Sequence, residues 1–392
     1  MKALRNYIDK IKPNFEKGGK LAMFHSTFDA FETFLFVPNK VTQHGSHIRD
    51  AIDMKRTMSV VVLALVPALL FGIWNVGYQN ALATGASIEF WPIVLHGLAK
   101  VLPIVVVSYA VGLAIEFAFA QVRKHEVNEG FLVTGMLIPL IVPVDIPLWM
   151  VALATAFTVV IGKEVFGGTG MNIFNPALLA RAFLFFAYPS HMSGDYVWVS
   201  GLTKGEGIVD GFSGATPLAN AAAYQLDKIP STVDMFLGLI PGSIGETSTL
   251  AILLGAFILI ISGIGSWKII VSTAVGGLTM GYIFNAFAVN PFMEIPAWHH
   301  LIMGGFAFGA VFMATDPVTA AQTEKGKWIY GFLIGLFAVL VRVVNPAYPE
   351  GMMLSILLLN AFAPLIDHYV IEANIKKRKK RAAAAAKTAK MP

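Results

Sequence analysis

The sequence predicts an all-α integral membrane protein of about ten transmembrane helices, and two observations carry this prediction. Of its 392 residues, 56% are hydrophobic and only 14% are charged, whereas a soluble globular domain has roughly 25% charged residues. Apolar stretches of about 20 residues, each long enough to cross ~30 Å of hydrocarbon, recur between Met58 and Ile366. The chain therefore has too little polar surface to fold as a soluble protein.

The expected spans follow these stretches, and prolines interrupt the third. Pro139, Pro143 and Pro147 predict a discontinuous or re-entrant segment, which is tolerated where protein or a cavity surrounds it. We expect spans near residues 57–76, 99–120, 131–149, 150–166, 173–189, 246–264, 268–289, 299–315, 328–346 and 350–368. The parts are then an N-terminal helical segment (1–56), a transmembrane domain (57–368) with a long loop (190–245), and a basic tail (369–392).

Basic residues indicate the orientation of the spans. Short loops on one side carry most of the lysines and arginines, among them Arg123, Lys163, Lys268 and Lys325. The positive-inside rule therefore places both termini in the cytoplasm and loop 190–245 outside.

A pair of short motifs occurs twice along the chain. Gly130-Phe131 precedes Asn175-Pro176-Ala177, and Gly305-Phe306 precedes Asn345-Pro346-Ala347 at a similar distance. Each block falls in the third to fifth helix of a five-helix half. Because each half has an odd number of helices, the two halves would have opposite orientations in the membrane and form inverted repeats, as in many transporters. The alternative is that such short motifs match by chance.

Cysteine is absent, which excludes disulfides, thiolate metal sites and cysteine-ligated iron–sulfur clusters. An electron carrier would then be organic or a haem. The histidines lie mostly near helix ends rather than in facing pairs, which argues against a haem. No dinucleotide-binding motif is present, so we do not expect NADH to bind this chain. The basic run Lys376–Arg381 predicts an anchor at the lipid surface or in the cytoplasm, not a nucleic-acid site.

Segment 1–56 shows apolar faces at helical spacing, such as the face formed by Leu4, Tyr7, Ile8 and Ile11. It is interpreted either as an interfacial helix or as a dock for a partner subunit.

Glycines in the loop from Lys163 to Asn175 either allow close helix packing or line a cofactor.

Loop 190–245 contains the segment Asp210-Gly211-Phe212-Ser213-Gly214-Ala215-Thr216-Pro217-Leu218. Glycine, serine and proline in such a cluster usually form a turn. A second interpretation is a covalent flavin site, in which the Thr216 hydroxyl forms a phosphoester with FMN. The small residues Ser213, Gly214 and Ala215 would let the phosphate and an attaching enzyme approach the backbone, whose N–H groups could bind the anion.

Ser213-Gly214-Ala215-Thr216 resembles the covalent-FMN motif shared by the B subunits of the sodium-translocating NADH:quinone oxidoreductases and the D subunits of the Rnf complexes. The stretch that ends in Gly45-Ser46-His47-Ile48-Arg49-Asp50 favours the B subunits, because the Rnf counterpart has a shorter N-terminus. Further stretches that resemble the B subunits are Val122–Phe131, Lys163–Pro176, Arg181–Pro189, Ile240–Leu250 and Arg342–Met353.

The resemblance implies FMN esterified to Thr216, near Asp210, and a noncovalent riboflavin in the same chain. It implies electron transfer from the FMN of the C subunit through both flavins to quinone, coupled to sodium export across the bacterial inner membrane. The partners would be the A, C, D, E and F subunits, a flavin transferase for maturation, and membrane lipid. The alternatives are the D subunit of an Rnf complex and a redox-free transporter built on the inverted repeat.

Acidic residues in spans are candidates for sodium translocation, because ionisable groups in hydrocarbon are costly. Glu116 lies deepest and follows Gly112 in a region that resembles the quinone-site and sodium-uptake segment of the B subunits. Leu113 stands where that pattern has a second glycine. Asp316 and Asp367 match acidic positions linked to sodium in the family.

Each acidic residue also has a structural interpretation. Asp316 precedes a proline and could form a turn, Asp367 could lie at the interface, and Glu116 could pair with another buried group. Arg181 and Arg342 could balance buried carboxylates or a flavin, or extend to the nearer face.

Overall fold

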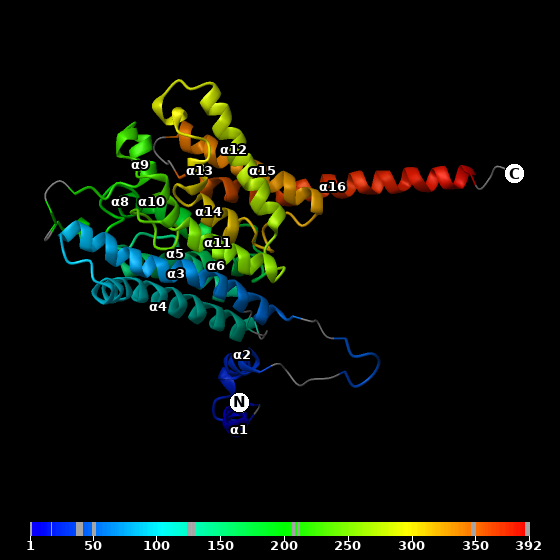
Figure 1. The fold of residues 1–392 in the computed structure, drawn as a ribbon. Coiled ribbons are helices and arrows are strands. Elements are labelled where there is room, and N and C mark those ends of the chain that lie inside the picture. The colour runs from blue at the N-terminus through cyan, green and yellow to red at the C-terminus, as the bar shows by residue number, and fades with distance from the viewer. Residues whose placement is uncertain are drawn as a thin grey trace.

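The computed structural model describes residues 2–16, 18–36, 42–48, 52–123, 127, 130–205, 208–209, 212–345 and 350–388. Within these residues the chain forms helices joined by loops and contains no strand. Figure 1 shows a bundle of helices with a short helical segment at the N-terminus and one long helix that projects at the C-terminus. The fold is therefore all-α, as the composition predicts.

Among the described residues, six helical segments are long and apolar enough to cross a membrane. They are α3 (Met54–Thr84), α4 (Phe90–Arg123), the segment Leu148–Phe166 that includes α6 (Leu148–Val160), α12 (Trp267–Ala286), α15 (Glu324–Val344) and α16 (Met352–Thr388). Three shorter apolar helices are α5 (Gly130–Leu140), α7 (Pro176–Ala187) and α11 (Thr249–Ile261). The chain is thus a multi-pass membrane protein.

Two expected spans are broken rather than continuous. After α5 the chain is non-helical through residues 141–147, where Pro143 and Pro147 stand. The expected span at 299–315 consists of α13 (His299–Ile302), α14 (Phe306–Phe308) and a π-helix. The count of ten spans, the inverted repeat and the side on which each terminus lies stay predictions.

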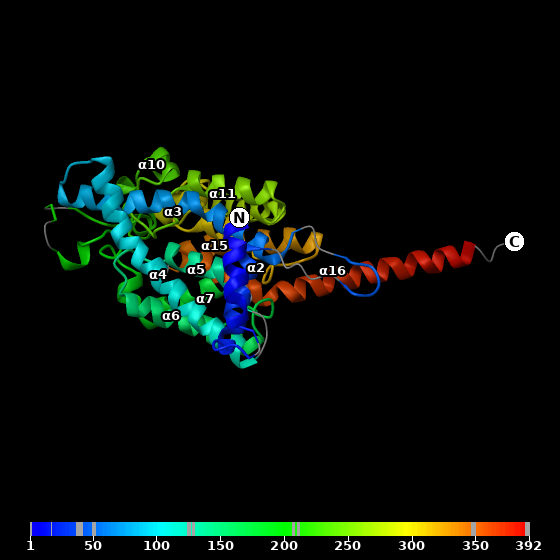
Figure 2. The same cartoon turned by 90° about the horizontal axis from the view of Figure 1, so that it is seen from below.

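Helices α3 and α4 run side by side (Figure 2) and expose apolar side chains on their outer faces. Leu70 and Leu102 are 61% and 50% exposed, as expected of residues that face lipid. The contact depends on glycine: a Cβ at Gly97 would lie 1.8 Å from the carbonyl oxygen of Ile73. Small residues at such crossings bring helix backbones together, which is typical of membrane proteins.

Helices α12 and α15 approach equally closely, since a Cβ at Gly335 would lie 1.9 Å from the carbonyl oxygen of Thr273. Helix α16 packs against α15, where the Tyr330 hydroxyl lies 2.6 Å from the side-chain amide of Asn360. Helix α16 has 37 residues, or about 55 Å at 1.5 Å per residue. The basic run Lys376–Arg381 therefore lies on a helical extension of α16.

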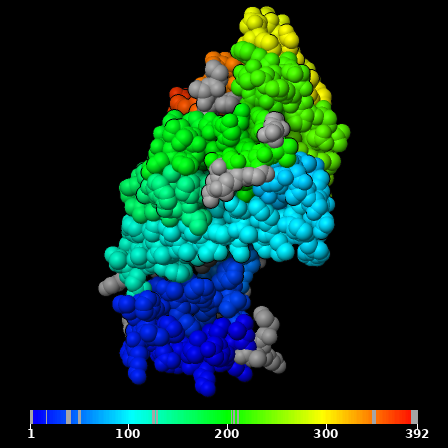
Figure 3. All heavy atoms as spheres, turned by 90° about the vertical axis from the view of Figure 1, so that its left-hand side faces the viewer, coloured from blue at the N-terminus to red at the C-terminus, as the bar shows by residue number. Residues whose placement is uncertain are grey.

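The N-terminal segment contains α1 (Lys2–Ile11) and α2 (His25–Leu35). These helices are held together by the buried Glu32, which forms ion pairs with Arg5 (3.1 Å) and Lys12 (2.9 Å). Phe31 contacts Phe117 of α4 edge to face, with 6.1 Å between ring centroids. Figure 3 shows the segment as a distinct projection at one edge of the molecule. This is compatible with both interpretations of the segment.

The repeated motifs occupy partly similar places in the fold. Gly130 begins α5, and Gly305 caps α14. Asn175 caps the beginning of α7, whereas Asn345 follows the end of α15. The two asparagines therefore differ in their local role.

Candidate functional site

Thr216, the last residue of the motif at 213–216, lines a cavity of about 110 Å³. Its walls come from segments that are far apart in sequence. They comprise Arg181, Phe185, Met192, Ser193, Gly194, Trp198, Thr216, Pro217, Leu218, Ala219, Ile240, Pro241, Gly242, Ser243, Glu246, Thr247, Gly304 and Glu350. Thr216 therefore lies at a cavity formed by distant parts of the chain, which we call the Thr216 cavity.

Thr216 caps the N-terminus of α9 (Pro217–Ala222). Its Oγ1 accepts the N–H of Ala219 at 3.1 Å, and Pro217 at the first helical position fixes the entry of the chain. The side chain is only partly buried. The cap thus holds the hydroxyl in a defined place at the cavity.

The neighbours of Thr216 explain why this segment needs small residues. A Cβ at Gly214 would lie 2.3 Å from the carbonyl oxygen of Asp195 and 2.7 Å from Leu202. Ser213 is exposed, and its hydroxyl accepts the N–H of Ala215 at 3.3 Å. Asp210, which the sequence also suggests for this site, lies outside the described residues.

A cluster of buried charges forms one wall of the Thr216 cavity. Arg181 of α7 donates to Glu246 at 2.7 Å and to Glu350 at 2.5 Å. Glu246 lies in the loop between α10 (Thr232–Leu237) and α11, and burial raises its pKa well above the ordinary carboxyl value. Arg181 opposes this shift of the pKa, and the nearby Glu350 adds to it. The guanidinium therefore compensates carboxyl groups, as one of the two interpretations of Arg181 predicts.

Arg342 is fully buried and, unlike Arg181, binds backbone carbonyl groups. It donates to the carbonyl oxygens of His300 (2.6 Å), Met303 (2.9 Å) and Glu350 (2.9 Å). These bonds satisfy backbone groups at the ends of broken helices, where no helical partner exists. Arg342 thus supports the segment that carries Glu350.

A second cavity of about 80 Å³ lies between α3, α5 and the segments around Asn175 and Asp316. Polar groups contribute to its walls, among them Thr134, Lys163, Asn172, Asn175, Thr315 and Asp316. An apolar cavity with a few polar groups is typical of a cofactor site.

Glu116 lies in α4 and is buried with Lys163, with which it forms an ion pair. Lys163 follows α6 and also lines the second cavity. The structural interpretation of Glu116, a pair with another buried group, therefore holds in this structure. Gly112 lies one turn earlier, and a Cβ there would lie 1.8 Å from the Phe131 ring. This ring contact accounts for a glycine at 112.

Asp316 and Asp367 both accept hydrogen bonds, but from different parts of the fold. Asp316 accepts from the N–H of Val318 (3.1 Å), the hydroxyl of Thr319 (2.9 Å) and the amide of Asn175 (3.3 Å), which joins it to the start of α7. It lines the second cavity.

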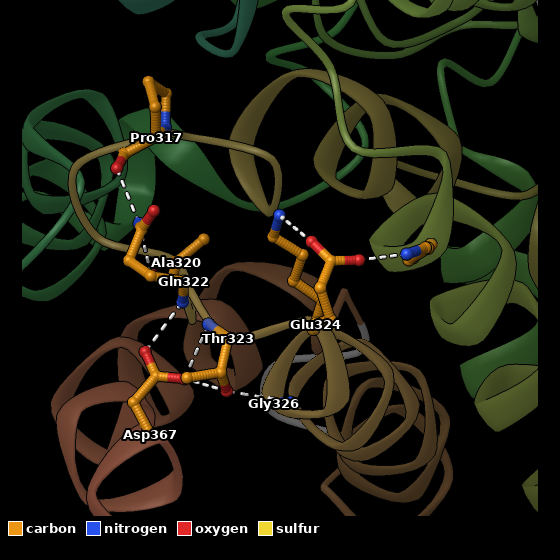
Figure 4. A network of polar contacts seen from close by, with 9 residues as sticks. Pro317, Ala320, Gln322, Thr323, Glu324, Gly326 and Asp367 are labelled. Atoms are coloured by element: carbon orange, nitrogen blue, oxygen red, sulfur yellow. Dashed lines mark hydrogen bonds and ion pairs between the residues drawn. The ribbon is translucent and has the colours of Figure 1, made fainter. Parts of the chain in front are cut away.

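Asp367 of α16 lies at the start of α15 (Figure 4). It accepts from the N–H groups of Gln322 (2.7 Å) and Thr323 (2.9 Å) and from the Thr323 hydroxyl (2.5 Å). Thr323 in turn caps α15. Asp367 thus ties two helices together at this point.

The sequence prediction assigned no role in the site to Glu246 or Glu350, and it used Lys163 only to orient the spans. Glu246 lies within the stretch Ile240–Leu250 and Glu350 within Arg342–Met353, both of which resemble B subunits. Their ion pairs join residues 65 and 169 positions apart, a distance in sequence that no local pattern can indicate.

A sequence model of the NQR2, RnfD, RnfE family matches residues 41–376. The chain belongs to this family. It is 48% identical to the B subunit of the Na(+)-translocating NADH-quinone reductase of Pseudomonas aeruginosa (strain LESB58), over 96% of this chain and 98% of the relative. Relatives of the same name from Azotobacter vinelandii (49% identical; 96% and 98% covered) and Yersinia pestis (48%; 96% and 99%) are similar. The resemblance to B subunits that the sequence indicates is confirmed.

Proposed function

We propose that this chain is the B-type membrane subunit of a sodium-translocating NADH:quinone oxidoreductase of the bacterial inner membrane. Near-complete coverage at 48–49% identity to subunits of that name supports the proposal. The single structural observation that carries it is the position of Thr216 at a cavity lined by both apolar and charged side chains. Its partners would be the A, C, D, E and F subunits and a flavin transferase.

Thr216 would hold FMN covalently. Esterification joins Oγ1 to the FMN phosphorus with net loss of water. The bound flavin would supply one- and two-electron transfer. Phe185, Trp198 and Leu218 offer apolar surface in the Thr216 cavity, and Ser213 and Ala215 leave the attachment point uncrowded.

The second cavity would hold the riboflavin. The argument is its location apart from Thr216 and its polar groups, such as Asn172, that can form hydrogen bonds to a ring or ribityl chain. Met58→Trp should fill it and lower the flavin released on denaturation, with covalent FMN unchanged. Met54→Trp is the matched control, one turn earlier on α3 and 51% exposed. Equal release from both variants would refute this location.

Sodium would pass near Glu116, Asp316 and Asp367, and quinone would bind near Gly112. Carboxylates suit a hard cation that prefers oxygen ligands. Asp316 and Lys163, the partner of Glu116, both line the second cavity. This arrangement could couple a flavin there to the ion path, because a change in flavin charge would act on both groups.

The deciding experiment is the intact mass of the denatured subunit, purified from a host with the flavin transferase. We expect a gain equal to FMN minus water on the Thr216 peptide, lost in Thr216→Val. Ser231→Ala is the matched control, since Ser231 caps α10 as Thr216 caps α9 but does not line the cavity. An unmodified wild-type chain would overturn the FMN assignment and favour the redox-free transporter.

The second candidate is the D subunit of an Rnf complex, because the matching family includes RnfD. Both candidates carry the FMN motif, so the mass does not separate them. Quinone reduction by the assembled complex does: NADH-dependent reduction of quinone supports the B-type assignment, and electron exchange between ferredoxin and NAD supports Rnf.

A further inference from the structure

The non-helical stretch 141–147 supports two walls of the Thr216 cavity. Just before it, the carbonyl oxygen of Leu140, the last residue of α5, accepts the N–H of Gly245 at 2.7 Å, next to Glu246. Near its end stands Asp145, between Pro143 and Pro147. A helix through this region would satisfy its own backbone groups, whereas the proline break leaves them free to hold neighbouring loops.

Asp145 binds the loop 193–205, which we call the cover loop. Its Oδ2 accepts the N–H of Gly201 at 2.6 Å and the hydroxyl of Thr203 at 3.3 Å. Its Oδ1 lies 3.3 Å from the Lys100 ammonium group of α4. The Asp145 side chain is only 12% exposed, so these charge-assisted bonds are partly shielded from water. Gly201 has φ +85°, a conformation that few residues other than glycine adopt.

Two further side chains hold the same point of the cover loop. Asn80 of α3 donates to the carbonyl oxygen of Ser200 at 2.8 Å, and His96 of α4 lies 3.2 Å from the Ser200 hydroxyl. The anchor is therefore built from α3, α4 and the proline break together.

The other face of the cover loop belongs to the cavity. Ser193, Gly194 and Trp198 line it. The carbonyl oxygen of Asp195 and the Leu202 side chain lie where a Cβ of Gly214 would stand, at 2.3 and 2.7 Å. The loop thus connects the Asp145 anchor directly to the segment that carries Thr216.

We propose that Asp145 is a positioning residue that holds the cover loop closed over the flavin of the Thr216 cavity and so keeps solvent from it. This inference rests on the proposed attachment of FMN to Thr216. Asp145 does not line the cavity, and it acts through Gly201 and Thr203. Removing its charge weakens both of these hydrogen bonds and the ion pair with Lys100, so the equilibrium between open and closed loop shifts by roughly tenfold or more.

The test uses the complete complex with Asp145→Asn, which keeps the shape of the side chain. Intact mass first establishes that FMN is bound. Iodide quenching of flavin fluorescence, measured on the native complex, then reports how accessible the flavin ring is to solvent. We expect unchanged FMN content and a severalfold larger quenching constant. The matched control is Asp195→Asn, which removes the same charge from an exposed position of the cover loop.

If Asp145→Asn does not assemble, Thr203→Val and Asn80→Ala weaken the same anchor from its partners and should each raise the quenching constant. Bound FMN with equal quenching in wild type, the assembled anchor variants and Asp195→Asn would overturn the role of Asp145. Absence of FMN from the wild-type chain would instead overturn the proposed attachment, so the two failures are distinguishable.

Discussion

Lys163 forms a buried ion pair with Glu116, which joins the turn after α6 to the C-terminal third of α4. Both side chains are at most 5% exposed. Their mutual attraction offsets the loss of hydration that each charge suffers inside the protein. The carboxylate that the sequence suggests for sodium uptake is thus compensated by a protein cation in this structure.

Lys163→Met should destabilise the protein strongly, because it leaves a buried carboxylate without its cation. Loss of one partner of such a pair costs about 3–5 kcal/mol. The double variant Glu116→Gln with Lys163→Met should recover much of this loss. Thermal unfolding of the purified complex measures both effects, and a single variant as stable as wild type would contradict the prediction.

Gly214→Val should lower FMN attachment. Its Cβ would stand 2.3 Å from the carbonyl oxygen of Asp195, so the segment must move and carry the Thr216 hydroxyl with it. The adjacent Ser213→Ala, at an exposed position, should keep most attachment. In-gel flavin fluorescence compares the two. Full labelling of Gly214→Val would show that the attaching enzyme tolerates a displaced segment.

Local patterns predicted much of the fold. The length of the apolar runs in the sequence predicted α3, α4, α12 and α15, because a helix in lipid needs an uninterrupted apolar run. Prolines predicted the break after α5. The span expected at 299–315 is instead three short pieces, since glycines and buried arginine bonds there replace regular helical hydrogen bonds. Such bonds depend on Arg342, about 40 residues away.

The sequence can indicate a candidate attachment point but not the residues that surround it in the fold. The motif around Thr216 is contiguous in sequence, so a resemblance can find it. The walls of the cavity combine Arg181, Glu246 and Glu350, which meet only after the helices assemble. For the same reason the sequence could not show that Lys163 pairs with Glu116.

Asp367→Ala should lower the thermal stability of the complex. A change in sodium coupling in this variant should therefore be compared with its loss of stability. The carboxylate accepts three hydrogen bonds at the start of α15 (Figure 4). These groups are only partly buried, so water can replace the carboxylate, and we expect a loss of about 0.5–1.5 kcal/mol. Glu324→Gln removes a nearby carboxylate that is exposed and pairs with Lys268 and Lys327, so it serves as control. Equal thermal stability of both variants would exclude a tie between α15 and α16 at Asp367.

The buried Glu246 predicts a loss of stability with rising pH. Burial raises the pKa of its carboxyl group in the folded protein, so the folded state retains a proton that the unfolded chain has released. Stability is then fully present below the ordinary carboxyl pKa and declines as pH rises toward the raised value. Glu246→Gln should flatten this decline in the thermal stability of the complex, whereas Glu324→Gln, a surface variant, should retain it. A decline of the same steepness in Glu246→Gln would show that Glu246 is ionised throughout, with Arg181 outweighing its burial.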